Sequence, residues 1–339
     1  MRFGPVPLEE AVGSILAHNL VGQDGKKLLG KGHLLTHEDA EILQANGYSN
    51  IVVAALDPTD LGENEAARRV GMAIAGPNVR VVAPGVGRAN LSAEVDGPLY
   101  INVPLLRRLN SIDEGITIAT LREHTPVKTR TLITLVKIIP FGIPAARVED
   151  VEAIAREFGP VVSVRPLQPT AVSLIISGPE RARERLLGDF TPPVEYRIQA
   201  LGSSLKSVSF VPHTAEAIMQ VLCDQQAAES GLIILAGISA IIDRDDVVPT
   251  ALRQAGGSVS HFGAPVDPGS LLMLGYLGNT PVIGAPGCIK SYKTNIIDWI
   301  LPRLLAGERL THADLIEMGH GGLLDDIHDR PMPRENTEN

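Results

Sequence analysis

The sequence predicts an α/β fold in which a mostly parallel sheet over residues 170–307 follows a β-rich region over residues 1–165. Strand-like and helix-like segments alternate from Ala171 onward, which is typical of β-α-β units. The segment 232–236 is a continuous apolar run, as expected for a strand covered on both faces of a sheet. The chain has 339 residues, more than one hydrophobic core usually organises, so we expect more than one domain.

The region 1–165 shows short β-prone runs, such as 50–54 and 79–83, separated by Gly, Pro and Asn turns. We expect few and short helices in its first part. One is predicted at 37–46, with Thr36 as its N-cap, and another at 148–158. The region is therefore predicted to be a β-rich unit of one or two small modules.

The elements of the second region follow in order. Strands are expected at 172–176, 207–211, 232–236, 258–262, 271–276 and 281–284, and helices from Pro179, at 214–228, 249–255 and 290–306. Cys223 belongs to an apolar stripe of the helix 214–228, so we expect it in the core. Residues 308–339 are predicted to form a carboxy-terminal extension, and its last fifteen residues have too little apolar content to fold, which predicts a flexible tail.

Composition excludes several classes of function. The net charge of −9 opposes a phosphate-tracking surface, and 4% aromatic residues leave few stacking platforms, so nucleic acid is not expected as a partner. No uncharged apolar stretch is long enough to span a membrane, and the amino terminus lacks a secretory signal, so we expect a soluble, cytoplasmic protein. Two distant cysteines fit a reducing compartment. A small ligand or a protein partner remains.

Three loops are expected at the carboxyl edge of the sheet, where ligands bind in folds of this class. The first loop contains Ser177, Gly178 and Glu180, with Pro179 at the start of a helix. Its backbone amides can face an anion. The alternative is an ordinary strand-to-helix turn.

The second loop begins with Gly237 and Ser239 directly after the buried strand, and three carboxylates follow at Asp243, Asp245 and Asp246. Clustered carboxylates can hold a metal or activate a water when mutual repulsion shifts their pKa values. The alternative is that these acids only cap the helix that follows, which is the stronger reading for Asp245.

The third loop contains Cys288 and two lysines, Lys290 and Lys293, in the first turns of the expected helix 290–306. Because a helix amino terminus disfavours cations, an anion such as phosphate would explain their position. In the alternative, the lysines extend into solvent and Cys288 is a small buried hydrophobe. A nucleophilic Cys288 would need a lowered thiol pKa. The nine histidines show no metal-ligand spacing, and His213 and His320 are interpreted as turn residues.

Together the loops resemble the molybdopterin-binding domain shared by molybdopterin adenylyltransferases and molybdopterin molybdotransferases, over residues 170–307. The matching residues are Ser177, Gly178, Glu180, Gly237, Ser239, Asp246, Pro286 and Gly287, and Pro268 with Gly269 resembles a further turn of the molybdotransferases. The resemblance implies a three-layer α/β/α domain that binds molybdopterin as ligand or substrate. It implies Asp246 and Asp243 as catalytic residues, with Asp246 on Mg²⁺, and it implies molybdate as a possible second substrate. The remaining ligand-binding residues would be Asp267, Cys288, Lys290, Ser291 and Lys293.

The chain also departs from the family pattern. Pro179 replaces an acid, Ala236 a glycine, Asp267 and Ser270 two lysines, and Cys288 an asparagine. The variant set is more similar to a bacterial branch in which this unit precedes a nucleotidyltransferase-like domain. The resemblance therefore leaves three functions open: an enzyme that inserts molybdate into molybdopterin, a non-catalytic carrier or sensor, and a relative that acts in pyridine-nucleotide salvage. It further implies a nucleotidyltransferase or a molybdoenzyme-maturation factor as partner, and a homo-oligomer.

Overall fold

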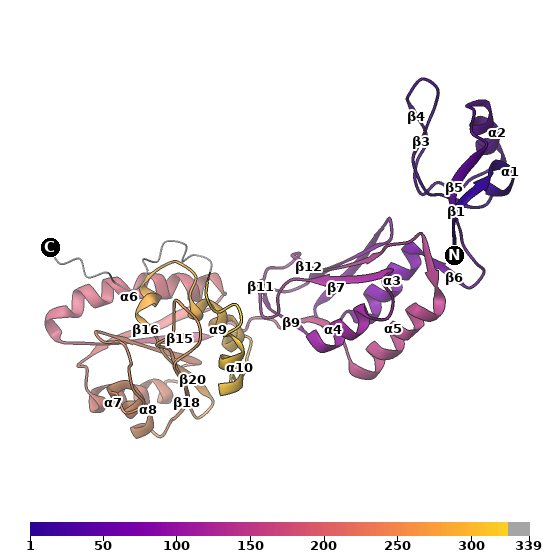
Figure 1. The fold of residues 1–339 in the computed structure, drawn as a ribbon. Helices are drawn as coiled ribbons and strands as arrows, with labels where there is room; N and C mark the ends of the chain where they lie inside the picture. The colour runs from indigo at the N-terminus through magenta and orange to yellow at the C-terminus, as the bar shows by residue number, and fades with distance from the viewer. Residues whose placement is uncertain (325–339) are drawn as a thin grey trace, which may run out of the picture. The chain divides into compact units, whose positions relative to one another are not determined.

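The structure is a computed structural model that describes residues 1–324. Two compact units divide the chain, Met1–Arg165 and Pro166–Asn339 (Figure 1). The tail predicted for the last fifteen residues lies outside the described residues. Among the residues that the structure describes, no helix has the length and apolar character needed to cross a membrane.

The second unit is built on a six-stranded sheet. Its spatial order is β16 (Ser204–Val211), β15 (Ala171–Ser177), β17 (Leu232–Gly237), β20 (Thr280–Gly284), β19 (Met273–Leu277) and β18 (Ser258–Phe262). The first four strands are parallel, and β19 runs antiparallel to both of its neighbours. The predicted α/β class is confirmed, and the predicted strands agree within a few residues.

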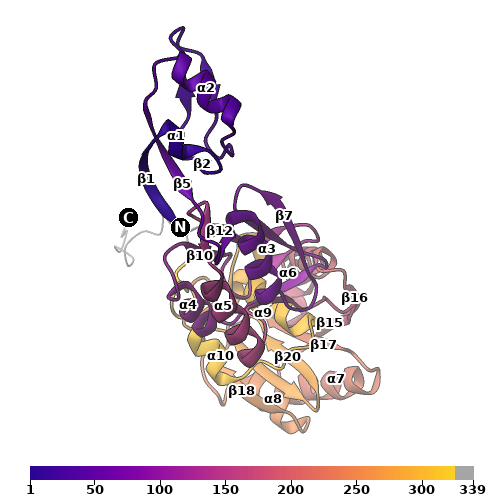
Figure 2. The ribbon, with the colours of Figure 1, turned by 90° about the vertical axis from the view of Figure 1, so that its right-hand side faces the viewer.

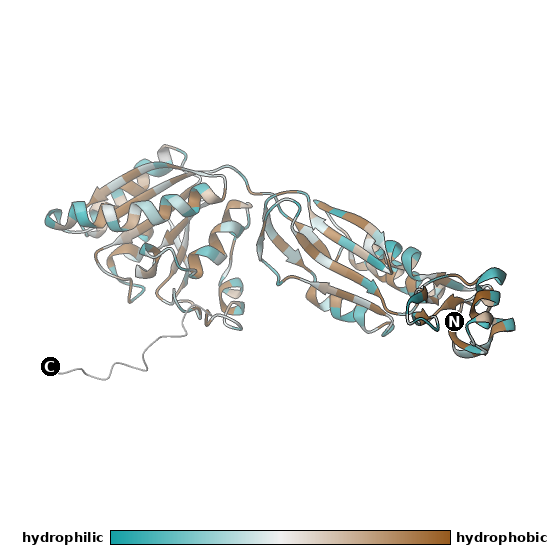
Figure 3. Ribbon diagram, turned by 90° about the horizontal axis from the view of Figure 1, so that it is seen from above, coloured by the Kyte–Doolittle hydropathy of each residue, from teal (hydrophilic) through white to brown (hydrophobic). Residues whose placement is uncertain are grey.

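Helices cover both faces of this sheet because its buried strands alternate their side chains. Leu174 and Ile176 of β15 face α6 (Arg183–Ala200) and α9 (Ile296–Leu305), whereas Ile175 faces α7 (Ala215–Ala227) and α8 (Val247–Gln254). Figure 1 shows α6 on one side of the sheet and α7 and α8 on the other. Figure 3 shows the strands as the hydrophobic part of this unit. Because the first four strands run parallel, their carboxyl ends lie at one edge of the sheet.

Residues 308–324 pack onto this unit. The short helix α10 (His312–Glu317) contributes Leu315 to the core beside α6 and α9, and Leu310 and Leu324 join it there. The buried Arg303 of α9 donates to Glu308 at 2.7 Å and to Asp314 at 2.8 Å. The first part of the carboxy-terminal extension is therefore held by apolar burial and by a charge-assisted clamp.

The predicted helix 290–306 is wrong at its start. A 3₁₀ turn η2 covers Gly287–Lys290, and α9 begins only at Ile296. Asn295 is the N-cap, and its capping box with Asp298 stops the helix from extending further toward the amino terminus. Lys290 and Lys293 therefore do not lie in the first turns of a helix, and the dipole argument for an anion beside them loses its basis.

The expected burial of Cys223 is also wrong. Ile218 and Leu222 of α7 are fully buried, whereas Cys223 is exposed. One residue beyond Leu222 is about 100° further around the helix. The buried stripe of α7 is therefore narrower than the apolar composition of the helix indicates.

The amino-terminal part of the first unit has its own small core. Figure 2 labels α1, α2, β1, β2 and β5 of this part. Its elements are β1 (Arg2–Pro7), α1 (Leu8–Ala11), β2 (Ile15–Leu16), β3 (Leu20–Val21), β4 (Lys27–Leu29), α2 (His37–Ala45) and β5 (Asn50–Ala55). The helix and strand predicted at 37–46 and 50–54 are confirmed. Thr36 is the N-cap of α2, in a capping box with Asp39.

The rest of the first unit surrounds a second core. It contains β6 (Asp60–Gly62), α3 (Glu63–Ile74), β7 (Val79–Gly85), β8 (Arg88–Ala93), β9 (Gly97–Ile101), α4 (Val103–Asn110), β10 (Ile116–Thr120), β11 (Pro126–Val127), β12 (Leu132–Ile138), β13 (Gly142–Pro144), α5 (Ala145–Phe158) and β14 (Val162–Val164).

Helices α3 and α4 are not among the helices predicted from the sequence. Helix α3 contains Gly71, which lowers helix propensity. A Cβ at Gly71 would lie 2.8 Å from Ala89 Cβ, so the glycine lets the helix lie close on β8. Packing on the sheet outweighs local propensity here.

Candidate functional site at the carboxyl edge of the sheet

Sheet register brings the ends of three strands together. Ser177, the last residue of β15, is level with Val211 of β16 and with Gly237 of β17. The chain that leaves β16 carries His213, and the Ser177 Oγ atom lies 2.9 Å from His213 Nδ1. Ser177 is only 1% exposed, whereas His213 is half-buried. The edge therefore holds a hydroxyl–imidazole pair.

His213 is predicted from the sequence as a turn residue only, and its contact with Ser177 is not among the predictions. The signal was present, because His213 follows directly after a parallel strand beside the one that ends at Ser177. What the sequence lacked was the order of the strands.

Two glycines of the predicted motifs make the edge compact. A Cβ at Gly237 would lie 2.6 Å from Ser177 Oγ, and a Cβ at Gly178 would lie 2.6 Å from Leu186 Cδ1. Neither glycine has the positive φ that only glycine tolerates well, so space rather than backbone conformation requires them here. Any side chain at Gly237 would push into the hydroxyl–imidazole pair.

The first loop leaves this edge through Pro179 into the 3₁₀ turn η1 (Glu180–Ala182). The Gly178 amide donates to the Val211 carbonyl at 3.0 Å, so it is used within the sheet edge. Glu180 is exposed and forms an ion pair with Arg183 at 3.1 Å. The guanidinium of Arg183 lies 5.4 Å from the centre of the Phe210 ring, which places a cation beside the end of β16.

The acidic loop after β17 is organised by caps. One oxygen of Asp246 accepts from the Val247 amide at 2.7 Å and the other from the Ile242 amide at 3.1 Å. Asp243 accepts from the Asp245 amide at 2.8 Å, and Asp245 pairs with Arg253 at 2.9 Å. Asp246 is thus the N-cap of α8, whereas Asp243 holds a turn within the loop and Asp245, for which capping was the stronger alternative, forms an ion pair instead.

Metal binding at this loop was tested against the donor set. Within residues 1–324, no group of three or more His, Cys, Asp or Glu side chains is arranged to hold a metal ion. Ser239 is exposed, and its hydroxyl donates to the Ala240 carbonyl at 3.2 Å. Both oxygens of Asp246, the carboxylate that the resemblance assigns to Mg²⁺, already accept backbone amides.

The third loop lies against α6. Strand β20 ends at Gly284, level with Leu235 and two residues short of Gly237. Beyond Pro286 and Gly287 the chain follows the helix, where the Lys290 Nζ lies 3.7 Å from Asp189 and 4.6 Å from the Phe190 ring centre. The predicted loops thus do not all converge on one point.

Arg197 of α6 holds the third loop in place. Its guanidinium is 5% exposed and donates to the carbonyls of Ile289, Ser291 and Lys293, at 3.2, 2.7 and 3.1 Å. It also forms an ion pair with Asp298 at 2.8 Å. Because these carbonyls are bonded to Arg197, the segment between η2 and α9 has hydrogen-bond partners without continuing as an α-helix. Arg197 is not among the residues predicted from the sequence.

Cys288 is half-buried in this loop. Burial raises the pKa of its thiol, and the nearby Arg197 only opposes this in part. A nucleophilic thiolate requires the opposite shift. The raised pKa therefore does not favour the nucleophilic alternative for Cys288.

The turn at Asp267, Pro268 and Gly269 packs on the start of α9. A Cβ at Gly269, whose φ is 135°, would lie 2.4 Å from Ile296 Cγ2. The backbone of Asp267 accepts from the Leu324 amide at 3.1 Å and donates to the Gly322 carbonyl at 2.8 Å. This turn is thus joined to the folded part of the carboxy-terminal extension, and Ser270 beside it is exposed.

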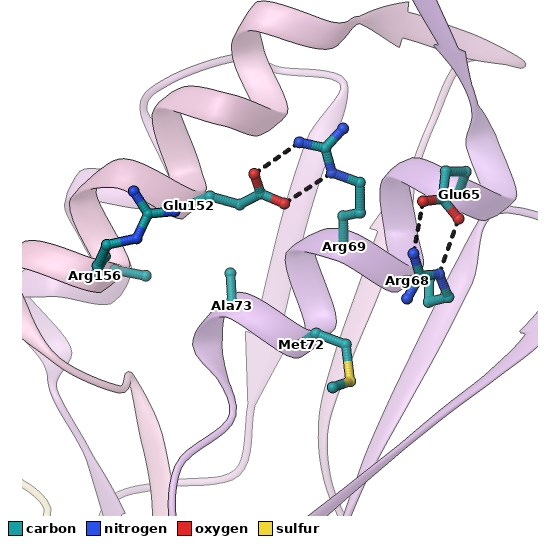
Figure 4. A pocket seen from close by; sticks show the side chains of 8 residues that line it. Glu65, Arg68, Arg69, Met72, Ala73, Glu152 and Arg156 are labelled. Atoms are coloured by element: carbon teal, nitrogen blue, oxygen red, sulfur yellow. Dashed lines mark hydrogen bonds and ion pairs between the residues drawn. The ribbon is translucent and has the colours of Figure 1, made fainter.

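The first unit has a separate open pocket of about 690 Å³ between α3 and α5 (Figure 4). Its charged residues are Glu65, Arg68, Arg69, Glu152 and Arg156. Arg69 forms a bidentate bond with Glu152 across the two helices, at 2.8 and 2.7 Å. Arg69 lowers the pKa of Glu152, and Arg68 lowers that of Glu65. The carboxylates and guanidinium groups therefore largely satisfy one another.

Comparison with known proteins adds limited information. No curated protein matches the sequence significantly. Residues 5–55 match the family model of a domain of unknown function, DUF8806. The residues of the candidate site lie outside that match.

Among solved structures, the chain is similar to a molybdenum cofactor biosynthesis protein from Pyrococcus furiosus, with 12% identity and a TM-score of 0.25 over 93% of this chain. It is also similar to the molybdopterin biosynthesis protein MoeA from Pyrococcus horikoshii, with 12% identity and a TM-score of 0.29 over 90% of this chain. The chain spans 65% of the length of the first protein and 75% of the second. TM-scores this low carry no argument about the site or the activity.

Proposed function

We propose that the second unit binds molybdopterin and serves in molybdenum cofactor biosynthesis. The observation that carries this proposal is the contact between two loops that the sequence resemblance assigns separately to the ligand. Ser177 of the first motif and Gly237 of the second are level in adjacent parallel strands and touch at their carboxyl ends. Such edges are where open α/β sheets bind their ligands.

Two activities are compatible with binding, and the donor groups favour one of them. Insertion of molybdate would need cations or a metal near the dithiolene, yet Asp267 and Ser270 stand where the family has lysines. Both oxygens of Asp246 accept backbone amides, and within residues 1–324 no three His, Cys, Asp or Glu side chains gather around a metal position. We therefore favour a carrier or sensor that retains the pterin without turnover, with insertion of molybdate as the second candidate.

An anaerobic binding experiment tests the proposal. The full chain is mixed with molybdopterin, separated by gel filtration and analysed for bound pterin, and pyridine nucleotides are tested in parallel by thermal shift. We expect the protein to retain the pterin and to show no stabilisation by pyridine nucleotides. Stabilisation by a pyridine nucleotide with no pterin retained would replace the proposal by the salvage function.

A second step separates the carrier from the enzyme. Molybdate, Mg²⁺ and a nucleoside triphosphate are added to the pterin complex, and the pterin is analysed for metal or nucleotide. The carrier predicts unchanged molybdopterin. A metal-loaded or nucleotidylated product would establish the transferase instead.

A further inference from the structure

In a catalytic nucleophile–base pair the nucleophile is accessible to the substrate. In the pair formed by Ser177 and His213, the imidazole is the more accessible group. Ser177 is 1% exposed and is covered by Gly237, so its hydroxyl cannot reach a ligand without displacing the strand end. His213 is half-buried, and in the described part of the chain its Nε2 is neither hydrogen-bonded nor enclosed. The imidazole is thus the group presented at the edge, and the serine is its support.

The serine contact is compatible with three states of the imidazole, which differ in whether Nε2 donates or accepts. The Ser177 hydroxyl has one hydrogen, and its two neighbours are His213 Nδ1 at 2.9 Å and the Ala236 carbonyl at 3.4 Å. If the hydroxyl donates to Nδ1, the neutral ring carries its hydrogen on Nε2. If the ring is protonated, both nitrogens donate and the hydroxyl turns to Ala236. In both of these states Nε2 is a hydrogen-bond donor. In the remaining neutral tautomer Nδ1–H donates to the Ser177 hydroxyl and Nε2 is an acceptor, so a bound anion would select the first two states.

A cation lies on the other side of the same strand end. A Cβ at Gly178 would lie 3.6 Å from Cζ of Phe210, and Arg183 lies against the face of that ring. Gly178 is therefore flanked by His213 beyond Ser177 and by Arg183 beyond Phe210. An anionic group at this strand end would lie near the imidazole of His213 and near the guanidinium of Arg183, which also pairs with Glu180.

We propose that His213 binds a phosphate oxygen of the ligand through Nε2, with Ser177 as the positioning residue that sets the ring orientation. The inference rests on the proposed function, because molybdopterin is a ligand with a terminal phosphate group. It also adds a residue that the motif resemblance does not assign. Phosphate is the chemical class recognised, whether it belongs to a pterin or is free.

The test compares His213→Gln with His320→Gln, since His320 is an exposed histidine of the same unit. The dissociation constant for molybdopterin is measured by equilibrium binding to the full chain. Loss of one hydrogen bond to a charged group should weaken binding about tenfold in His213→Gln and leave His320→Gln unchanged. Equal affinities of the two variants would overturn the role of His213 while the proposed function stands.

A second readout does not depend on the pterin. Nitrogen-15 NMR of the imidazoles is followed while inorganic phosphate is added, and the His213 signals are identified by their loss in His213→Gln. We expect a saturable shift of the His213 Nε2 signal, and a different Nδ1 signal in Ser177→Ala before any phosphate is added. If the wild type binds no molybdopterin, the proposed function fails, and this titration alone decides the inference. A His213 signal that phosphate leaves unchanged would then overturn it.

Discussion

The edge around Ser177 and the loop from Pro286 to Lys293 were both expected to bind the ligand, but they are built in different ways. At the edge, the contacts follow from strand register, which sets Ser177 beside Gly237. In the loop, the path follows from Arg197, a side chain about ninety residues earlier that bonds three loop carbonyls. A glycine motif predicts the position of a loop well where the register of neighbouring strands determines that position. It predicts the position poorly where a distant side chain, such as Arg197, determines the path of the loop.

The largest effect is expected from Arg197. Its replacement in Arg197→Met removes the donors of the loop carbonyls and leaves Asp298 without its buried partner. We expect the free energy of unfolding in urea to fall by roughly 3 kcal/mol, because breaking a buried ion pair strands its other member. Arg185→Met, on the same helix with an exposed guanidinium, should change it by less than about 0.5 kcal/mol. Equal effects would show that Arg197 does not hold the loop.

A substitution at Gly237 tests the strand edge around Ser177. In Gly237→Ala the new Cβ would lie 2.6 Å from Ser177 Oγ, so the strand ends must separate. We expect a loss of about 1–3 kcal/mol in the free energy of unfolding, typical of overpacking. Gly188→Ala is the matched control, because its Cβ would meet open space within α6 and should stabilise by up to about 1 kcal/mol. A stable Gly237→Ala would mean that the edge is less compact than described.

The two cysteines sharpen the account of the loop. Single-cysteine proteins made by Cys223→Ser and Cys288→Ser are treated with a disulfide reagent at pH 8, and the rates of thiol modification are compared. Cys223 is exposed, whereas burial raises the pKa of Cys288. We therefore expect Cys288 to react at least about tenfold more slowly than Cys223. Faster modification of Cys288 than of Cys223 would support a reactive thiolate at Cys288 instead.

The smallest effect is a pH dependence at the carboxy-terminal extension. His261 of β18 is buried, and its Nδ1 lies 2.7 Å from Nδ1 of His312 on α10. Burial, then the charge of His312 and that of Arg244, lower the pKa of His261.

Because the unfolded chain takes up this proton at a higher pH than the folded chain, stability should fall as the pH drops below the ordinary histidine pKa. The melting temperature is measured between pH 7.5 and 5.5. His261→Gln should lose part of the pH dependence, and His320→Gln should retain it. If the melting temperature of His261→Gln depends on pH in the same way as that of the wild type, His261 is not the source of the pH dependence.

Sequence patterns located the second unit well because its strands are continuous apolar runs and its glycine loops follow directly after them. They failed where packing overrides local signals, as in α3, whose Gly71 fits against Ala89, and in Cys223, which lies just outside the buried stripe. The start of α9 was missed although its Asn295–Asp298 capping box is visible in the sequence. His213 was missed because the neighbours of β16 are a property of strand order, which periodicity does not report.

The central claim is that the strand edge around Ser177 and Gly237 binds molybdopterin. The most direct measurement is the amount of pterin retained anaerobically by the full wild-type chain and by its Gly237→Ala variant, with Gly188→Ala as the control. The account predicts retention by the wild type and the control, and a clear loss in Gly237→Ala because the edge is forced apart. Equal retention by all three proteins, or by none of them, would contradict it.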